Sequence, residues 1–183
     1  MPKVALVQVV YNSKRFMSRV IPAALNQTEK DIEFYAVIAG NDDGGLEHLE
    51  EHHPEVKILD PGTNVGFARG HNLIFNEIDA PYFQLINPDR IISPDFVEKM
   101  LVPFDGTADL GAVGGKLLKY DFDRDQPTSI IDSTGVIIRK TGRALDRGQH
   151  EPDTGQYDER LELMAVSGAA AMYSCLLYTS DAA

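Results

Sequence analysis

Short apolar runs alternate with segments of helical periodicity over the first half of the chain. The first run, VALVQVV at residues 4–10, is rich in β-branched residues, as is typical of a strand buried on both faces of a parallel sheet. Similar runs at residues 32–39, 56–59 and 82–86 predict three more strands.

Between these runs, apolar residues recur at the spacing of an amphipathic helix. They do so over residues 16–25, where Pro22 is expected to kink the helix, and in a more charged helix from Leu46 onward. The string Ser93-Pro94-Asp95 supplies an N-cap hydroxyl, a proline in the first turn and an acid near the positive end of the helix dipole. We expect the helix that follows it to end by Pro103.

Strands that alternate with helices predict an α/β fold: an open sheet with right-handed crossovers whose ligands bind at the carboxyl ends of the strands. After Leu110 the regular alternation of predicted strands and helices ends. We expect short strands at 112–113 and 136–138, a turn at Gly142 and a polar loop over residues 146–160.

Composition narrows the class of protein. With 183 residues and 43% hydrophobic residues, the chain suits one globular domain. Lys and Arg total 17 against 28 Asp and Glu, and the net charge of −11 argues against binding to nucleic acid or anionic lipid. No apolar run approaches the roughly 20 residues that span a bilayer, and no signal peptide is evident, so we expect a cytoplasmic protein. The single cysteine, Cys175, cannot form an internal disulfide.

The first candidate for chemistry is the break after the first strand. A dinucleotide-binding Rossmann protein places G-x-G-x-x-G there, whereas this chain has Tyr11-Asn12-Ser13, which disfavours a nicotinamide or flavin dinucleotide. An aromatic ring beside an amide can hold a base by stacking and hydrogen bonding. The alternative is that Tyr11 covers the core and Asn12 forms a turn.

The second candidate is residues 64–72, where two glycines permit close approach and a helix N-terminus supplies free N–H groups. Arg69 adds a cation, so the segment suits an anionic ligand such as a diphosphate. The alternative is a plain turn into a helix, with glycine for packing. His71 lies on the apolar face of this helix and is expected in the core.

The third candidate is Asn87-Pro88-Asp89, directly after the fourth predicted strand. A carboxylate at the end of a strand can bind Mg²⁺ or Mn²⁺, with phosphate oxygens completing the coordination shell. Asn-Pro-Asp is also a common turn. Two other acidic or histidine-bearing segments, at 48–52 and 121–125, lack the spacing of zinc and calcium sites and are expected on the surface.

Four motifs in this order resemble the family 2 glycosyltransferases, most closely the bacterial rhamnosyltransferase-type members. They are VVYNS at 9–13, Asn64-x-Gly66-Phe67-Ala68-x-Gly70-x-Asn72, LINPD at 85–89 and SGAA at 167–170. The resemblance covers residues 3 to about 174 and implies one GT-A domain over residues 1–174. Its fold would be a Rossmann-like open mixed sheet with helices on both faces, binding a nucleoside-diphosphate sugar between the strand ends.

The resemblance also implies roles for individual residues. Asp89 would be the metal carboxylate for Mn²⁺ or Mg²⁺, in a motif usually written D-x-D whose first position here is Asn87. The nucleotide-sugar donor would be bound by Tyr11, Asn12, Asn64, Gly66, Arg69, Gly70, Asn72 and Asn87, with Gly168 and Ala169 on the acceptor side. From the helical faces we expect Arg69 and Asn72 to point toward the donor, and Phe67, Ile74 and Phe75 to be buried.

The sequence departs from the family pattern in two places. The second strand of family members ends in an Asp that recognises the base, whereas residues 37–41 read VIAGN, so Asn41, Asp42 or Asp43 would have to substitute. The catalytic aspartate of the family lies downstream of SGAA. We therefore expect the chain to be C-terminally truncated and inactive as it stands, with a non-native tail at 175–183.

The implied reaction is an inverting displacement in which an acceptor hydroxyl, deprotonated by a carboxylate, attacks the anomeric carbon while the nucleoside diphosphate leaves. The acceptor would be a saccharide or a lipid-linked saccharide, and the latter would bring the protein to the inner face of the membrane. Two alternatives remain open: a sugar nucleotidyltransferase, which would need a glycine-rich basic loop after the first strand, and a non-catalytic nucleotide-sugar-binding module.

Overall fold

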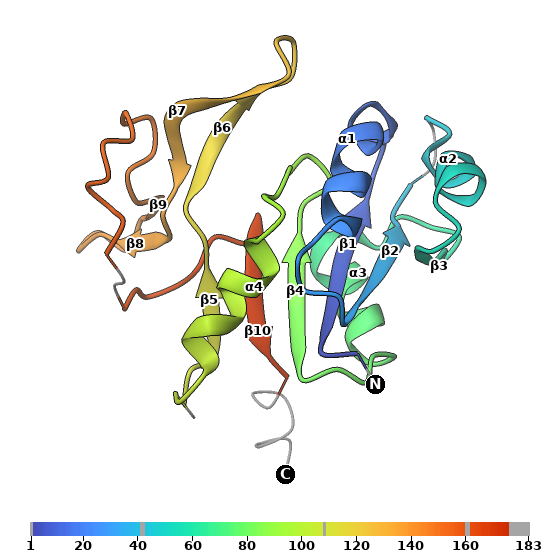
Figure 1. The fold of residues 1–183 in the computed structure, drawn as a ribbon, viewed down its shortest axis with the longest axis horizontal. Helices are drawn as coiled ribbons and strands as arrows, with labels where there is room; N and C mark the ends of the chain where they lie inside the picture. The colour runs from blue at the N-terminus through green and yellow to red at the C-terminus, as the bar shows by residue number, and fades with distance from the viewer. Residues whose placement is uncertain (1, 41–42, 108, 160–161, 176–183) are drawn as a thin grey trace.

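The first strand, β1 (Val4–Val10), is an interior strand of the main sheet, and all seven of its residues are buried. Its apolar, β-branched sequence suits a position covered on both faces. The computed structural model describes residues 2–40, 43–107, 109–159 and 162–175 (Figure 1). Of the expected tail at 175–183, all but Cys175 lie outside these residues.

A six-stranded mixed sheet in the order β3-β2-β1-β4-β10-β5 forms the body of the protein (Figure 1). Strands β1 to β4 run parallel to one another, and β10 runs antiparallel to both β4 and β5. Beyond β1, its strands are β2 (Ile32–Ile38), β3 (Lys57–Leu59), β4 (Tyr82–Ile86), β5 (Ala112–Gly114) and β10 (Ala170–Ser174).

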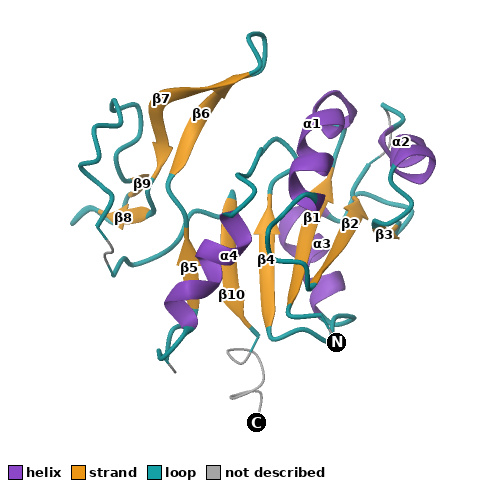
Figure 2. Cartoon of the chain, in the orientation of Figure 1, coloured by secondary structure: helices purple, strands orange, loops and turns teal. Residues whose placement is uncertain are grey.

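Helices cover both faces of this sheet, as the sequence predicts (Figure 2). Three of them share one apolar core cluster with the even-numbered positions of β1: α1 (Lys14–Leu25), α2 (Gly45–His52) and α4 (Phe96–Leu101). On the opposite face, α3 (Gly66–Phe75) packs on the odd-numbered positions. Helix α1 runs through Pro22, and α4 passes into a short 3₁₀ helix, η1 (Val102–Phe104). None of the helices in the described ranges is both long enough and apolar enough to cross a membrane.

Two small antiparallel ribbons stand beside the main sheet (Figure 1). One pairs β6 (Leu117–Asp121) with β7 (Gln126–Ser133), and the other pairs β8 (Val136–Ile138) with β9 (Ala144–Asp146). Gly142 lies in the turn between β8 and β9 with a positive φ of 81°, as expected.

Of the strands after residue 110, the sequence predicts only those that correspond to β5 and β8; it does not predict β6, β7, β9 or β10. The β6 and β7 ribbon is mostly half-exposed, so neither strand carries a continuous apolar run. Strand β7 even contains Pro127.

The tip of the β6–β7 hairpin is fastened to α1. Arg19 Nε lies 2.8 Å from Asp125 Oδ1, and the rings of Phe16 and Phe122 pack with their centroids 4.8 Å apart. The acidic segment 121–125 therefore forms the hairpin turn and a surface ion pair rather than a calcium loop. These contacts connect the hairpin tip to the helix layer on one face of the main sheet.

Candidate active site

Tyr11 and Asn12 follow β1 at the carboxyl edge of the sheet. The Tyr11 side chain is 53% exposed, and Ser13 Oγ donates a hydrogen bond of 2.8 Å to the Tyr11 carbonyl. One side of the ring faces Gly40, which follows β2; a Cβ atom there would lie 2.7 Å from Tyr11 Cδ2. Asn12 adopts a positive φ of 44°, a conformation that Asn tolerates better than most residues. The chain turn at Asn12 thus presents Tyr11 at the sheet edge with one face supported.

Asp43 fastens the segment after β2 to the starts of two helices. Its Oδ2 accepts a hydrogen bond of 2.7 Å from the N–H of Lys14, and its Oδ1 accepts one of 3.1 Å from the N–H of Gly45. These donors open α1 and α2, where backbone N–H groups lack helical partners. The carboxylate of Asp43 is therefore engaged in capping, whereas Asn41 and Asp42, the other candidates for base recognition, lie outside the described residues.

Asn64 and Gly66 shape the entry to α3. Asn64 Oδ1 accepts a hydrogen bond of 2.8 Å from the N–H of Gly66, which is the side-chain turn that Asn commonly forms. Gly66 has a φ of 69°, so glycine is the residue that adopts this turn without strain. The carboxamide of Asn64 and the backbone of Gly66 together set the direction in which α3 starts.

Gly70 brings α3 close to the central strand. A Cβ atom at Gly70 would lie 2.7 Å from Cγ2 of Val9, so the glycine allows helix and strand to approach. Gly70 is buried, whereas Arg69 is exposed on the neighbouring side of the helix. Packing is therefore the contact that the structure shows for Gly70.

Asn72 lies in a groove of about 180 Å³ between α3 and strands β4 and β10. The groove is lined by Phe67, Ala68, His71, Asn72, Phe75, Phe83, Leu85 and Tyr173. The expectation that Phe67 is buried is wrong, because its side chain is 50% exposed in the first turn of α3. Its ring packs on that of His71, with centroids 4.4 Å apart.

His71 is a core residue, as the sequence predicts. It is 6% exposed, its Nδ1 lies 2.8 Å from the Phe67 carbonyl, and burial lowers the pKa of its ring below the ordinary value. Ile74 is buried and Phe75 is half-buried. The apolar side of α3 therefore begins at His71 rather than at Phe67.

The end of β4 brings together Asn87, Asp89 and Ala169. The N–H of Asn87 donates a hydrogen bond of 2.9 Å to the Ala169 carbonyl, which joins β4 to the segment that precedes β10. Oδ1 of Asn87 is buried and accepts no hydrogen bond within the described part of the chain. The side chain of Asp89 is 48% exposed. Gly168 precedes Ala169 in the chain. A Cβ atom at Gly168 would lie 3.9 Å from Cζ of the Phe67 ring.

The carboxyl ends of β1 and β4 share one edge of the sheet. The two strands pair in parallel up to Val7 and Leu85, and neighbouring strands in a sheet lie about 4.8 Å apart. Tyr11 and Asn87 therefore follow adjacent strands at the same edge, where open α/β sheets bind ligands.

Sequence reasoning misses two residues beside Asp89. Arg90 places Nη1 2.9 Å from Oδ2 of Asp132 and Nε 3.5 Å from Oδ1 of Asp89. Arg90 directly follows the predicted metal carboxylate, but Asp132 belongs to β7, a strand that the sequence does not predict. No local signal therefore links Asp132 to this edge of the sheet.

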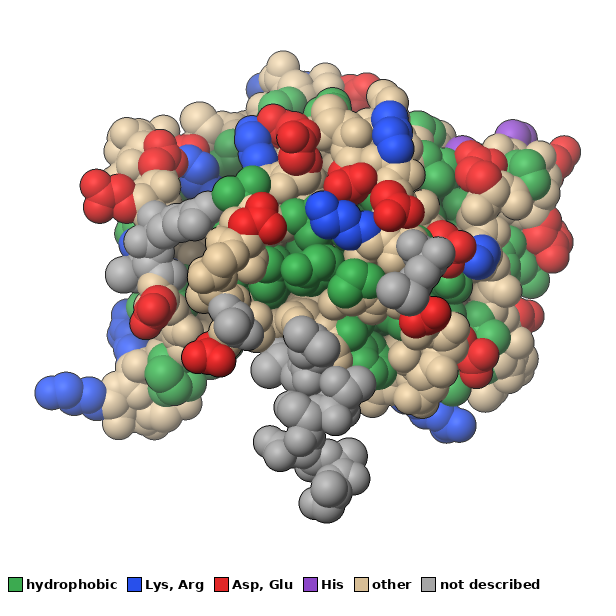
Figure 3. Space-filling view, turned by 60° about the horizontal axis from the view of Figure 1, so that its bottom comes forward, with side chains coloured by type: hydrophobic (Ala, Val, Ile, Leu, Met, Phe, Trp, Pro, Cys, Tyr) green, Lys and Arg blue, Asp and Glu red, His purple; other side chains and the backbone are tan. Residues whose placement is uncertain are grey.

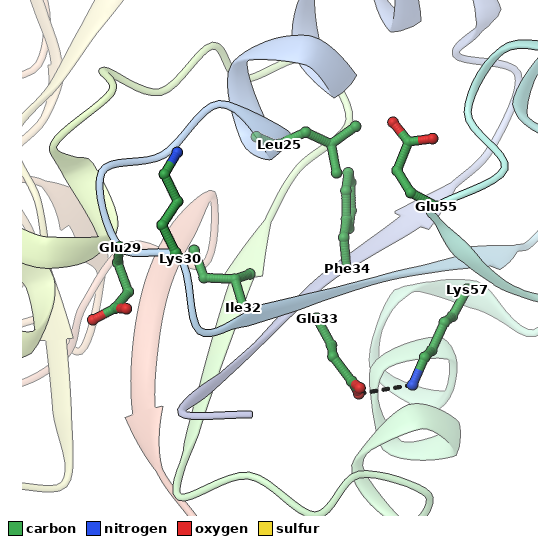
Figure 4. A pocket seen from close by; sticks show the side chains of 9 residues that line it. Leu25, Glu29, Lys30, Ile32, Glu33, Phe34, Glu55 and Lys57 are labelled. Carbon is green, nitrogen blue, oxygen red and sulfur yellow. Dashed lines mark ion pairs between the residues drawn. The ribbon is translucent and has the colours of Figure 1, made fainter. Parts of the chain in front are cut away.

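A cavity of about 320 Å³ lies at the opposite end of the sheet, where β2 and β3 begin (Figure 4). Its apolar floor is formed by Leu25, Ile32 and Phe34, and Glu33 at its rim pairs with Lys57 at 2.8 Å. Its charged residues are Glu29, Glu33, Glu55, Lys30 and Lys57, an acid-rich set that does not favour a diphosphate. Figure 3, turned toward this end, shows acidic and basic side chains interspersed around apolar ones.

Histidines and acids elsewhere do not form a metal site of their own. The rings of His48 and His52 stack on α2 with centroids 4.6 Å apart. Over the described ranges, no three His, Cys, Asp or Glu side chains lie close enough together to hold a metal ion. A cation at Asp89 would thus have at most one further such side chain as a ligand among the described residues, and other oxygen atoms would complete its coordination.

Comparison with solved structures identifies the fold. The structure of Staphylococcus aureus TarS 1–349 superposes with a TM-score of 0.62 at 16% identity, over 98% of this chain and 49% of that one. The mannosyltransferase PcManGT from Pyrobaculum calidifontis, solved with GDP-Man and Mn²⁺, gives a TM-score of 0.54 at 16% identity, over 64% of this chain and 36% of that one. At such identities the likeness shows the fold alone, which is GT-A.

Sequence comparison identifies the family. Chondroitin synthase of Escherichia coli is 29% identical over 154 residues, which are 82% of this chain and 20% of that protein. The chain spans less than half the length of the curated relatives that it matches. The model described as "Glycosyl transferase family 2" matches residues 6–165, and this protein therefore belongs to glycosyl transferase family 2.

Proposed function

We propose that this chain forms the donor site of a metal-dependent, inverting hexosyltransferase. The donor is a nucleoside-diphosphate sugar, with rhamnose as the sugar that its motifs favour. The single observation that carries the proposal is the half-exposed Asp89 carboxylate at the end of β4, at the same sheet edge as the exposed Tyr11 ring. This pairing offers a surface for a base and an oxygen ligand for the metal of a metal–diphosphate group.

The atoms present at this edge fit a hard divalent cation. Mg²⁺ and Mn²⁺ prefer carboxylate, amide and phosphate oxygens. Asp89 supplies an accessible carboxylate, and two residues before it Asn87 has a buried Oδ1 that lacks a hydrogen-bond donor among the described residues. We infer that Asp89 binds the cation and that Asn87 orients the turn or contributes its oxygen.

We assign a separate role in donor binding to each of the residues at the carboxyl end of the sheet. Tyr11 stacks on the base, with Asn12 beside it, while Asn64 and Gly66 direct the N-terminus of α3, the positive end of the helix dipole, toward the diphosphate. Arg69 and Asn72 lie farther along α3, and Gly168 and Ala169 border the acceptor side. A bound cation would neutralise charge that builds on the leaving diphosphate.

The reaction we propose is one displacement at the anomeric carbon, with the acceptor hydroxyl forming the new bond as the nucleoside diphosphate leaves. The residue that deprotonates the hydroxyl is not assigned. PcManGT, solved with GDP-Man and Mn²⁺, supports the metal and the donor class, and the relative chondroitin synthase supports a saccharide acceptor. We place the reaction in the cytoplasm, with a lipid-linked acceptor bringing it to the inner face of the membrane.

Calorimetry with UDP, dTDP and GDP, each with and without Mn²⁺, tests the proposal. We expect one nucleotide to bind more tightly with Mn²⁺ and its sugar derivatives to raise the melting temperature. The proposal fails if none of the three binds. Acceptor-dependent release of nucleoside diphosphate, measured with a complete version of the gene, then separates a transferase from a non-catalytic binding module.

A further inference from the structure

The guanidinium group of Arg90 lies between two carboxylates from different parts of the fold. Its Nη1 is 2.9 Å from Oδ2 of Asp132 in β7, and its Nε is 3.5 Å from Oδ1 of Asp89 after β4. The side chains of Arg90 and Asp132 are 26% and 22% exposed, whereas that of Asp89 is 48% exposed. Arg90 therefore makes its shorter and more buried ion pair with Asp132.

Arg90 and a divalent cation would compete for the same carboxylate. At 3.5 Å from Asp89, a fixed positive charge weakens the attraction of that carboxylate for any other cation. Nε of Arg90 is buried and donates no hydrogen bond to the described residues, so a shift of the guanidinium toward Asp89 would satisfy it. The contact that opposes such a shift is the ion pair with Asp132.

Asp132 is well placed to hold the guanidinium back, because its neighbours in β7 are paired with β6. Ile131 pairs with Leu118 and Ser133 with Leu117, and the register shifts between these two pairs, at Asp132. Asp132 therefore acts from a strand that is paired on both sides of it. The turn that carries Asp89 and Arg90 lies instead outside strand pairing, half-exposed at the carboxyl end of β4.

We propose that Asp132 is a positioning residue that holds Arg90 away from Asp89 and so keeps the Asp89 carboxylate available for the metal of a metal–nucleotide donor. This role rests on the proposed function of Asp89. It makes Asp132 act through Arg90 rather than by touching the donor. Without the charge of Asp132, Arg90 closes on Asp89 and excludes the cation.

The test measures Mn²⁺ affinity of the whole chain in saturating UDP, by electron paramagnetic resonance of free Mn²⁺. We expect Asp132→Asn to weaken Mn²⁺ binding about tenfold, the effect of about 1.4 kcal/mol of added competition. Arg90→Gln removes the competitor and binds Mn²⁺ at least as tightly as the wild type. We expect the double variant, Arg90→Gln with Asp132→Asn, to have the Mn²⁺ affinity of the wild type. Asp132→Glu, which keeps the negative charge, should retain most of that affinity.

A matched control breaks the other Arg–Asp pair of the same hairpin. Arg19→Gln and Asp125→Asn remove the ion pair at the tip, remote from Asp89 in the sequence, and we expect no change in Mn²⁺ affinity. Urea unfolding of each variant verifies that the fold is retained. A loss of Mn²⁺ affinity in the tip variants would overturn the proposal, because hairpin attachment alone would then explain the effect.

Four other results would overturn it. If both single variants weaken Mn²⁺ binding and the double variant does not regain the wild-type affinity, the Arg90–Asp132 ion pair has only a structural role. If Arg90→Gln weakens UDP binding without metal, Arg90 is a phosphate ligand. If Asp132→Asn binds Mn²⁺ as the wild type does, only this inference fails, whereas a wild type without Mn²⁺-dependent UDP binding overturns the metal role of Asp89 as well.

Discussion

The ring of Tyr11 lies directly over Gly40, so that a Cβ atom on Gly40 would stand 2.7 Å from Tyr11 Cδ2 and 2.8 Å from Cε2. Glycine at this position lets the ring rest on the backbone after β2. The side chain is nevertheless 53% exposed. One face of the ring is thus supported while the rest remains accessible to a base.

Gly40→Ala should therefore weaken nucleotide binding by displacing the ring. We expect Tyr11→Ala to weaken UDP or dTDP binding about tenfold, since stacking of a base on an aromatic side chain contributes about 1–3 kcal/mol, and Tyr11→Phe to have little effect. In the Tyr11→Ala background, Gly40→Ala should cause no further loss. Calorimetry of the wild type and the four variants checks this, and additive losses of Gly40→Ala and Tyr11→Ala would show that Gly40 acts independently of Tyr11.

Asp89→Ala should abolish the Mn²⁺ dependence of nucleotide binding and leave the fold intact, because its side chain is 48% exposed at the end of a strand. The metal-free affinity should persist. Glu50→Ala on α2 is the charge-matched control, since Glu50 is also exposed but lies on a helix away from the strand end. Calorimetry with and without Mn²⁺ decides, and unchanged metal dependence in Asp89→Ala would refute the assignment.

Gly70→Ala should destabilise the protein, because the new Cβ would lie 2.7 Å from Cγ2 of Val9 and push α3 away from β1. Overpacking of this kind costs about 1–3 kcal/mol in the free energy of unfolding. Val9→Ala removes both methyl groups of the clash, so Gly70→Ala should cost less in that background. Urea titrations of the full cycle measure the coupling, and equal costs in both backgrounds would contradict the packing role.

His71 should make stability fall in mild acid. Burial lowers the pKa of its ring below the ordinary value of 6.5, so below about that pH the unfolded chain binds a proton that the folded chain refuses. The free energy of unfolding therefore decreases as the pH falls through 6.5. His71→Phe should flatten this dependence, although the similarly lowered pKa of His48 leaves part of it.

Urea unfolding at several pH values between 5 and 8 measures the His71 effect, a range chosen around the ordinary histidine value. His150→Gln is the matched control, because His150 is exposed and lies after β9, away from His48 and His71 in the sequence. Its pH dependence should match that of the wild type. An unchanged slope in His71→Phe would mean that other groups dominate acid sensitivity.

The parallel half of the fold could be predicted from sequence because each buried strand is a continuous apolar run. The first predicted run, residues 4–10, coincides with β1, and the run at 82–86 coincides with β4. The short run SGAAAMYS does not resemble them, although Ala170, Ala171 and Met172 are fully buried in β10.

The candidate site is predictable only where its residues follow strands in the sequence. Tyr11 and Asp89 are recognisable because each comes directly after a buried run. The sequence makes Asp43 a candidate for base recognition, but its carboxylate accepts hydrogen bonds from the first N–H groups of α1 and α2. Asp132 could not be found, because its proximity to Arg90 depends on the position of a separate hairpin that no local pattern specifies.

The position of β10 in the sheet imposes an order on folding during synthesis. Strand β5 pairs only with β10 among the described strands, and β10 begins at Ala170. The parallel core from β1 to β4 can therefore form once β4 has been synthesised, whereas residues 112–114 have no strand partner until β10 has been synthesised as well. Until β10 pairs with β4, the backbone N–H and C=O groups along one side of β4 have no strand partner. A chaperone or a second nascent chain can bind to this unpaired side of β4 during that time.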